Sequence, residues 1–363
     1  MKRFFLLLIP LSIISCTQSR SIQKPTKNIY SELNDKIPKW LKEYDIPGVS
    51  VTSIEEGKIV WSKTFGMQNE NTKATDSTLY LSASIAKPMT AEIFLRLASE
   101  GKVNLDESMA KYWLDPDIAE DDRAKLLTPR HVLTHQTGFK NWRRMTGGKL
   151  QFEWNPGTKM GYSGEGFLYL VKYLENKLKK PFNQIAKEVL FIPEEMHSAS
   201  YVYQDGFDNK MAWPYFPNSV WQEPRKVENA SGAGGLRITT QDYAKFVVSI
   251  LNNNRVSSQL RKEQFTISLN QFEHCRKSST TPDACPKNLG FGLGWYIYDF
   301  KNERVIGHTG ANAAERTLAV FSPDTKKGLV VMSNGSNGNH ILFKIADAIG
   351  INKNFIDIEK PKK

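Results

Sequence analysis

The chain has 363 residues, which is enough to bury a sizeable core and allows one large domain or two. Hydrophobic residues make up 40% and aromatic residues 11% of the sequence, an ordinary globular composition that excludes a collagenous, disordered or coiled-coil chain. The formal net charge is +11, from 49 Lys and Arg against 38 Asp and Glu. Because lysines scattered over a solvated surface give such a balance without any polyanionic partner, we assign no function to the charge.

The first residues have the features of an export signal rather than of a folded element. Lys2 and Arg3 precede an apolar run at Phe4–Ile14, which is too short to span a bilayer. The run ends at Ile13-Ile14-Ser15-Cys16, which resembles a bacterial lipobox, where a signal peptidase cuts before the cysteine and a diacylglyceryl group is attached to its sulfur. An ordinary signal peptide with a coincidental cysteine is the alternative.

The lipobox interpretation predicts an exported lipoprotein, anchored to a membrane through Cys16 and facing the periplasm or the cell exterior. Residues 1–15 are then a lipoprotein signal peptide, and the polar residues 16–28 are a lipidated tether. Because an exported protein rarely meets nucleic acid, we expect no such partner; anionic lipid head groups and cell-wall polymers are nearer neighbours. In an oxidising compartment Cys275 and Cys285 are expected to form a disulfide, with two free thiols as the alternative.

Both ends of the remaining chain predict strands joined by turns, with helices beside them. Apolar residues follow a helical spacing in some segments, and in others short apolar runs flank turns rich in Gly, Pro and Asp. The predicted elements are a helix at residues 30–44, a hairpin at 49–54 and 58–65, a second hairpin at 317–321 and 328–332, and a helix at 340–349.

The middle of the chain has helical patterns instead. Thr128-Pro129 is a capping residue followed by proline at the first helical position, which predicts a helix to about Gln136. Apolar residues repeat at helical spacing over residues 167–178 and 243–251, the second behind a Thr239-x-x-Asp242 cap.

Strands at both ends with helices between them predict an α/β (α+β) fold. We expect an antiparallel sheet flanked by helices and built from both ends of the chain, beside a mostly helical lobe. Residues 29–363 would form a single domain, with residues 29–100 and 236–363 in the α/β lobe and residues 101–235 in the helical lobe. A cleft between two such lobes is a usual place for a small-molecule site.

Ser84 and Lys87 are a candidate catalytic pair. Because Pro88 is tolerated only in the first turn of a helix, a helix must begin near Ser84, and both side chains then point to one side of it. Apolar neighbours would lower the pKa of the lysine and make it a usable base for the serine hydroxyl. The Ser84 amide, at the positive end of the helix, could also bind an oxyanion. Ser-x-x-Lys alone is a weak motif, and a capping serine beside a solvated lysine is the alternative.

Two further segments supply a phenol and an imidazole. Tyr162 lies in a glycine-bounded loop before a helix, and His308-Thr309-Gly310 ends a strand. In order and spacing these segments resemble the serine β-lactamase and penicillin-binding protein superfamily, most closely its class C β-lactamase-like branch, which includes D-alanyl-D-alanine carboxypeptidases and esterases. Ser84-x-x-Lys87 matches the nucleophile motif, Tyr162-Ser163-Gly164 stands where that branch has Tyr-x-Asn, and His308-Thr309-Gly310 where it has Lys/His-Thr-Gly.

The resemblance extends from about residue 30 to residue 350. Residues 127–138 (LTPRHVLTHQTG) are similar to the branch's LTxRHLLTHTSG stretch, residues 230–242 to its AGGLxSTAxD segment, and residues 291–295 to its YGLGW. It implies a β-lactamase/transpeptidase-like fold for the single catalytic domain and no metal or organic cofactor. We expect the protein to be a monomer.

The resemblance also implies roles for individual residues. Ser84 would attack the acyl carbon of a small-molecule or peptide substrate, and Lys87 and Tyr162 would share the proton transfers. The backbone amides of Ser84 and Ala311 would form the oxyanion hole, and His308 completes the predicted catalytic set.

The substrate-binding residues implied by the resemblance are His308, Thr309 and Gly310, which would meet a substrate carboxylate or its equivalent. Gly164 stands where most members of the branch carry the asparagine that hydrogen-bonds the acylamide of β-lactam and peptide substrates. Losing that contact removes about 1 kcal/mol of binding, which shifts the expectation toward esters or unusual amides.

The predicted function is therefore a serine acyl hydrolase acting through a Ser84 acyl-enzyme on a β-lactam, a D-Ala peptide or a carboxylic ester. A catalytically silent penicillin- or cell-wall-binding lipoprotein is the alternative. His131 and His135 have a spacing that can bind zinc, but structural histidines are the preferred interpretation. Likewise, residues 231–235 are interpreted as a close-packed turn near the cleft rather than a phosphate loop.

Overall fold

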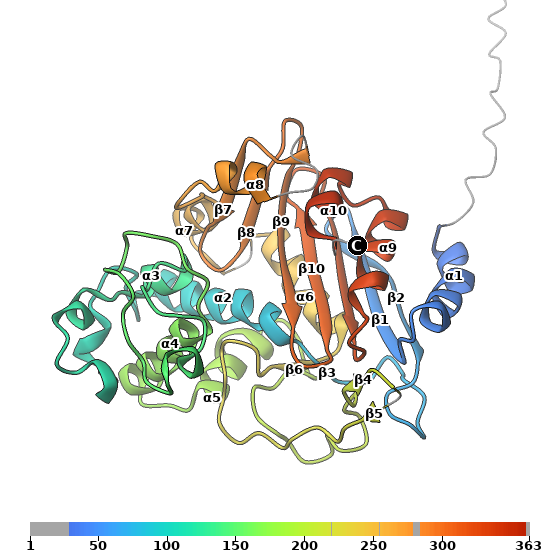
Figure 1. Ribbon diagram of the computed structural model, residues 1–363, viewed down its shortest axis with the longest axis horizontal. Helices are drawn as coiled ribbons and strands as arrows, with labels where there is room; N and C mark the ends of the chain where they lie inside the picture. The colour runs from blue at the N-terminus through green and yellow to red at the C-terminus, as the bar shows by residue number, and fades with distance from the viewer. Residues whose placement is uncertain (1–28, 219, 254, 279–283, 361–363) are drawn as a thin grey trace, which may run out of the picture.

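A seven-stranded antiparallel sheet forms the centre of the molecule (Figure 1). The computed structural model describes residues 29–218, 220–253, 255–278 and 284–360, so the predicted signal peptide, tether and Cys16 lie outside the described residues. The strand order is β2-β1-β11-β10-β9-β8-β7, so the two ends of the chain build one sheet, as predicted. The strands are β1 (Gly48–Glu55), β2 (Lys58–Gly66), β7 (Asn288–Phe291), β8 (Tyr296–Asp299), β9 (Arg304–Ala311), β10 (Arg316–Ser322) and β11 (Lys327–Ser333).

Turn residues account for the two hairpins that the sequence predicts. Gly57, between β1 and β2, has a φ of 72°, in the left-handed region that glycine adopts without strain. The two hairpins then pair with each other, because β1 lies against β11 with Val51 opposite Val331. The first hairpin is thus completed by strands from the far end of the chain.

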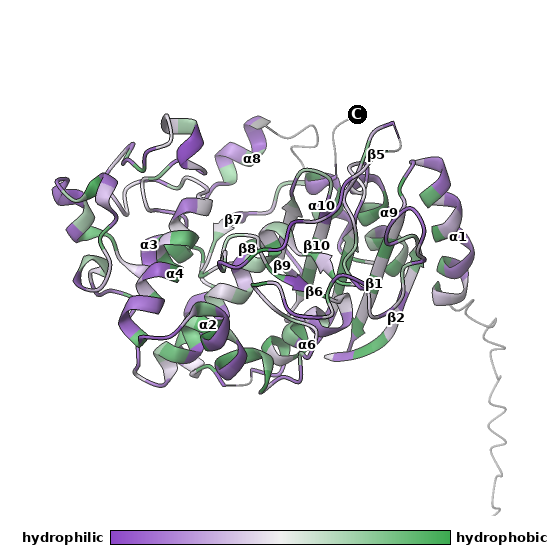
Figure 2. Ribbon diagram, turned by 90° about the horizontal axis from the view of Figure 1, so that it is seen from below, coloured by the Kyte–Doolittle hydropathy of each residue, from purple (hydrophilic) through white to green (hydrophobic). Residues whose placement is uncertain are grey.

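Helices cover both faces of the sheet, and the alternation of side chains along the strands explains why. On β10, Leu318 and Val320 point into the core beneath α1 (Ile29–Glu43), α9 (Asn339–Ile349) and α10 (Lys353–Glu359). The neighbouring Ala319 and Phe321 point to the opposite core, which is covered by α6 (Thr240–Leu251) and α2 (Ala86–Ser99). Figure 2 shows many hydrophobic residues along α2 and α6.

The helical lobe lies beside the sheet and is joined to it by α2 (Figure 1). Its main elements are α3 (Pro129–Leu133), α4 (Gly164–Leu178) and α5 (Phe182–Ala186), with short 3-10 turns η2 (Met109–Lys111), η3 (Pro116–Ile118), η4 (Asp122–Leu126) and η5 (Arg143–Thr146) and a π-helical turn η6 (Lys187–Phe191). The remaining elements are α7 (Ser258–Gln264), α8 (Phe272–Ser278) and two small pairs, β3 (Tyr80–Leu81) with β6 (Arg237–Ile238) and β4 (Tyr215–Phe216) with β5 (Val220–Trp221).

The helix predicted from Thr128 to about Gln136 is shorter than expected. Its start is as predicted, since the Thr128 side chain accepts a hydrogen bond from the His131 amide, but α3 ends at Leu133. His135 has a φ of 56°, which a continuing helix does not allow. Its Nδ1 accepts a hydrogen bond from the Ser163 amide at 3.1 Å, so a tertiary contact replaces the last helical turn.

Cys275, on α8, is joined by a disulfide to Cys285, which precedes β7. Of the helices in the described part of the chain, none is long and apolar enough to cross a bilayer.

Candidate active site

Ser84 lies on a tightly held turn at the start of α2. It is the central residue of the 3-10 turn η1 (Ala83–Ile85), so α-helical geometry begins at Ala86, just after the serine. Ala83 has a φ of 49°, an uncommon conformation for a residue with a side chain. The Tyr243 hydroxyl holds the turn from α6 by donating a hydrogen bond to the Ile85 carbonyl at 2.8 Å. The turn that carries Ser84 is therefore held in place by a contact from α6.

Lys87 is fully buried behind Ser84. Its Nζ donates hydrogen bonds to Ser84 Oγ at 3.2 Å and to the Ala233 carbonyl at 2.7 Å, and it lies 4.8 Å from the centre of the Tyr162 ring. Burial disfavours the charged ammonium and lowers the pKa of Lys87 from 10.5 to about 7. The residue is therefore poised to accept a proton from Ser84 near neutral pH.

Tyr162 faces the same pair from the loop before α4. Its hydroxyl hydrogen-bonds Ser84, which favours the phenolate, but the stronger effect of burial raises its pKa above the ordinary value. The ring stacks on His135 with 4.3 Å between ring centres, and burial, followed by the charge of Lys87, holds the pKa of His135 well below its usual range. His135 thus positions Tyr162 as a neutral ring, a role that the sequence did not reveal because it depends on the Ser163 contact.

His308 lies on β9, opposite Tyr162, with 6.0 Å between the two ring centres. Burial, followed by the charge of Lys87, lowers its pKa to about 3, so the imidazole is neutral at physiological pH. Its Nδ1 donates a hydrogen bond to the Thr309 carbonyl at 2.6 Å, which leaves Nε2 as an acceptor. Nε2 is buried and has no hydrogen-bond partner among the described residues. His308, which was expected to meet a substrate carboxylate, therefore presents a lone pair and no positive charge.

Gly310 is required because β9 packs against the nucleophile turn. A Cβ at this position would lie 2.1 Å from Thr317 Oγ1, 2.8 Å from the Ser82 carbonyl oxygen and 3.1 Å from the Ser84 amide nitrogen. Beside Gly310, Thr317 Oγ1 donates a hydrogen bond to the Ser82 carbonyl, which joins β10 to the residue just before the turn. Ala311, the next residue, lines one cavity together with Ser84, which is the placement expected of the two amides of an oxyanion hole.

Gly164 has no room for the asparagine that the resemblance would place there. A Cβ would lie 2.5 Å from the Trp142 ring. Instead, the Gly164 amide donates a hydrogen bond to Asn141 Oδ1 at 2.8 Å. Asn141 lines the cavity that contains Ser84, and its Nδ2 has no hydrogen-bond partner within the described part of the chain. A side-chain amide is therefore present at this edge of the site, supplied by another loop.

Asn141 is a candidate functional residue that sequence reasoning missed. The only signal in the sequence was the glycine at residue 164, which indicates that another residue must supply a side-chain amide if the site has one. The sequence could not identify the replacement, because the answer depends on where the loop before η5 folds back onto α4.

The catalytic cavity has a volume of about 510 Å³. Its wall is formed in part by Phe291, Tyr296 and Tyr298, with Gln271, His274 and Glu359 as polar members. No lysine or arginine is among the described residues that line it. This wall therefore offers aromatic surface and hydrogen-bonding groups rather than a guanidinium or ammonium charge.

The other segments singled out in the sequence have identifiable structural roles. The turn at residues 231–235 supplies the Ala233 carbonyl that binds Lys87. His131 Nδ1 accepts a hydrogen bond from the Thr128 amide at the start of α3, while His135 binds the Ser163 amide, so the two histidines serve different loops.

The nucleophile turn, the buried lysine, the neighbouring phenol and the antiparallel sheet define the architecture of a serine acyl hydrolase of the penicillin-recognising type. A family model described as beta-lactamase matches residues 30–351, and the chain belongs to this family. The superfamily consists in general of serine hydrolases.

Similar proteins are distant in sequence. Protein flp of Staphylococcus aureus strain MW2 is 22% identical over 342 residues, which cover 85% of this chain and 64% of flp. This chain thus spans less than two thirds of that relative. Penicillin-binding protein 4 of Amycolatopsis lactamdurans is 20% identical over 328 residues, covering 81% of this chain and 82% of that protein.

Two solved structures share the fold. The octameric penicillin-binding protein homologue from Pyrococcus abyssi superposes with a TM-score of 0.71 at 22% identity, covering 89% of this chain and 78% of that one. The D-alanine carboxypeptidase AmpC from Burkholderia cenocepacia also gives 0.71, at 17% identity, covering 88% of this chain and 99% of that one.

Proposed function

We propose that this protein is a serine acyl hydrolase that acts through an acyl-enzyme on Ser84, with an amide or ester as substrate. Uncharged Lys87 accepts the Ser84 proton while Oγ forms a bond to the substrate carbonyl carbon. The carbonyl oxygen becomes an oxyanion held by the amides of Ser84 and Ala311. The Tyr162 hydroxyl passes a proton to the leaving group as the bond between that group and the acyl carbon breaks, and Tyr162 recovers a proton from Lys87. Water then attacks the ester on Ser84, giving one proton to Lys87, which returns it to Ser84 Oγ as the acid is released.

The observation that carries this proposal is the contact between Ser84 Oγ and Lys87 Nζ at 3.2 Å. A serine hydroxyl is a weak nucleophile until a base takes its proton, and burial has given this lysine a pKa of about 7. A surface lysine with its ordinary pKa would be almost fully protonated at neutral pH and could not serve.

The wall of the cavity favours an uncharged leaving group, and hence an ester or an unusual amide over a β-lactam or a D-Ala peptide. Leaving groups of the latter two carry a carboxylate beside the scissile bond. His308 is neutral, and the described lining contains no lysine or arginine to neutralise that charge. Glu359 is an acidic member of the lining; burial raises its pKa, and the Tyr298 hydroxyl donates it a hydrogen bond.

We also propose that the protein is an exported monomer, anchored to a membrane through a lipid on Cys16. The lipobox-like segment supports the anchor. The Cys275–Cys285 disulfide supports export, since such bonds persist mainly in oxidising compartments.

The full-length protein in detergent should react at Ser84 with a fluorophosphonate probe, and Ser84→Ala should abolish the reaction. Ser77→Ala, which removes an exposed hydroxyl away from the cavity, is the matched control and should react normally. Parallel labelling with a fluorescent penicillin tests the leaving-group argument, which expects weaker labelling than with the fluorophosphonate. If neither probe nor any p-nitrophenyl ester gives a Ser84-dependent adduct, the catalytically silent binding protein is the correct interpretation.

A further inference from the structure

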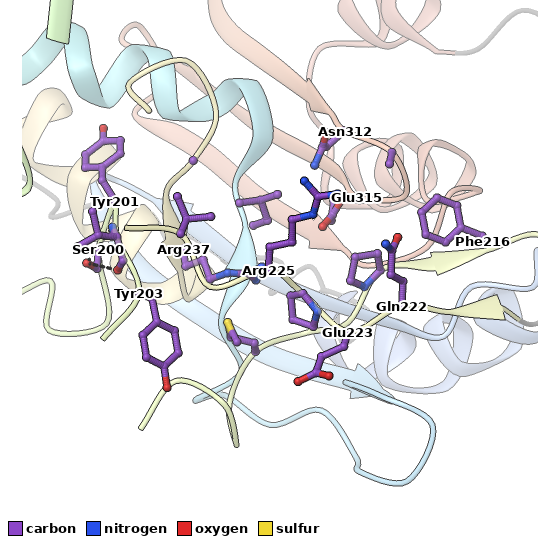
Figure 3. A pocket seen from close by; sticks show the side chains of 18 of the residues that line it. Ser200, Tyr201, Tyr203, Phe216, Gln222, Glu223, Arg225, Arg237, Asn312 and Glu315 are labelled. Atoms are coloured by element: carbon purple, nitrogen blue, oxygen red, sulfur yellow. Dashed lines mark hydrogen bonds between the residues drawn. The ribbon is translucent and has the colours of Figure 1, made fainter. Parts of the chain in front are cut away.

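Two further hollows continue from the catalytic cavity along the turn that joins β9 to β10. The first, about 590 Å³ in volume, shares Ala311 with the catalytic cavity. The second, about 540 Å³, shares Asn312 and Ala313 with the first and reaches Arg237 and Glu315 (Figure 3). We call this second hollow the acyl-side cavity, for the reason that follows.

The placement of the proton-transfer groups shows which part of a substrate would enter it. Tyr162 and His308 line the catalytic cavity together with Ser84, so we assign the leaving group, which needs a proton, to this cavity. The acyl chain is then left to extend past Ala311, which the catalytic cavity shares with the first hollow. From there the hollows along the β9–β10 turn lead to the acyl-side cavity.

Two opposite charges face the acyl-side cavity without partners. Arg237 has 9% of its surface exposed and Glu315 2%, and neither side chain has a hydrogen bond or ion pair to a described residue. Burial lowers the pKa of Arg237 while the Glu315 charge opposes that shift, so the two groups interact electrostatically, but they do not form a direct ion pair. Arg316, beside Glu315, instead donates to the backbone carbonyls of Asn312 and Glu315.

Glu92 shows how a buried charge elsewhere in the described residues is paired. Glu92, also fully buried, is paired with Arg96 at 3.2 Å and with Arg261 at 2.8 Å. Removing a charge from water without pairing it is strongly unfavourable, so an unpaired buried arginine and glutamate in one cavity indicate that the partner comes from outside the chain.

We propose that the acyl-side cavity binds the far end of a substrate acyl group that carries both a carboxylate and an ammonium, as an unblocked amino acid does. The carboxylate pairs with the Arg237 guanidinium, for which a planar two-oxygen group is the best match, and the ammonium pairs with Glu315. Arg225 and Glu223 lie at the exposed rim of the acyl-side cavity (Figure 3) and add a second positive and a second negative side chain to its lining. This inference rests on the proposed acyl hydrolase activity, because that activity supplies the direction of the acyl chain.

The test uses p-nitrophenyl esters whose acyl chains end in a neutral group, a carboxylate, an ammonium or both. Each ester is made with spacers of one, two and three glycines, so that chain length does not limit the result. For full-length protein in detergent, kcat/KM for the doubly charged ester should exceed that for the neutral ester by at least about tenfold at the best spacer, as expected for two desolvated charge contacts.

Two variants separate the two contacts. Arg237→Gln should remove the advantage of the carboxylate, and Glu315→Gln that of the ammonium, each measured as a ratio to the neutral ester with the same variant. Lys125→Gln and Glu70→Gln change the net charge equally at exposed positions outside both cavities and should preserve the ratios. Thermal unfolding and titration of Ser84 with fluorophosphonate show whether each variant is folded.

Equal kcat/KM for all four ends at every spacer length would overturn the proposal, as would unchanged ratios in both variants. If both variants also lower the unfolding temperature while the ratios stay unchanged, Arg237 and Glu315 are a structural pair and nothing more. Failure of the proposed function looks different, because then no ester is hydrolysed in a Ser84-dependent manner.

Discussion

The low pKa of Lys87 predicts a specific pH profile for acylation. If uncharged Lys87 is the base, the rate follows the uncharged fraction, which is about one tenth at pH 6 and about nine tenths at pH 8 for a pKa of about 7. The rate should therefore rise about tenfold between these values and reach a plateau above pH 8. A lysine with the ordinary pKa would instead give a rise of about a hundredfold over the same interval, with no plateau below pH 10.

His308, His135 and Tyr162 do not titrate in this window. Burial lowers the pKa of His308 to about 3 and that of His135 well below its usual range, and it raises the pKa of Tyr162 above its ordinary value. His274 also lines the cavity, so the profile is repeated with His274→Gln, which should keep the same midpoint.

The assay is the second-order rate of Ser84 labelling by an uncharged fluorophosphonate, measured from pH 5.5 to pH 10. Because such a reagent has no titrating group, the midpoint of the pH profile gives the pKa of a group on the protein. A midpoint near pH 10, or a profile that is flat across this range, would refute the assignment of Lys87 as the base.

Four further predictions follow from the same geometry. Between about pH 7 and pH 10.5, Lys87 is protonated in the unfolded chain but largely uncharged in the folded one, so this residue makes the free energy of unfolding rise with pH. Lys87→Met should remove this contribution and stabilise the protein at pH 7 by up to about 4 kcal/mol, as measured by denaturant titration. Gly310→Ala should lower the free energy of unfolding by about 1–3 kcal/mol and slow Ser84 labelling, because the new Cβ would clash with Thr317 and the Ser82 carbonyl. Gly307→Ala on the same strand is the control and should have little effect, because a Cβ there would lie no closer than 3.4 Å to its neighbours. Asn141→Asp keeps an acceptor for the Gly164 amide but loses the Nδ2 donor, so the unfolding temperature should change little. For substrates with an acyl-side carbonyl, kcat/KM should fall about fivefold, a loss of about 1 kcal/mol. An equal fall for substrates without that carbonyl would contradict the proposed contact between Asn141 and the substrate. Cys16→Ala should abolish incorporation of radiolabelled palmitate and release the protein from the membrane fraction, and continued labelling would disprove the anchor.

The elements that the sequence predicts well are those whose signals are local. The first hairpin is marked by Gly57, and α6 by Thr239, whose side chain accepts a hydrogen bond from the Asp242 amide at 3.2 Å. The pairing of β1 with β11 has no local signal, because it joins segments at opposite ends of the chain. Only the presence of strands at both ends suggested a shared sheet.

In the candidate site, too, the features with a local sequence signal could be predicted and the others could not. Ser84 and Lys87 are separated by only two residues at the start of α2, so their spacing alone places them together. The Ala233 carbonyl that binds Lys87 comes from a distant turn and has no side-chain signature. The neutral state of His308 likewise depends on burial, which the sequence does not display.

The strand order also constrains when the sheet can form during synthesis. Since β1 lies between β2 and β11, the N-terminal hairpin has no sheet to join until β11, residues 327–333, has emerged from the ribosome. Contacts of such long sequence separation form slowly, because a long loop must close before they are made. The N-terminal hairpin therefore stays unpaired for a time, and the turn that carries Ser84, which packs against β9 and β10, is completed only after nearly the whole polypeptide has been made.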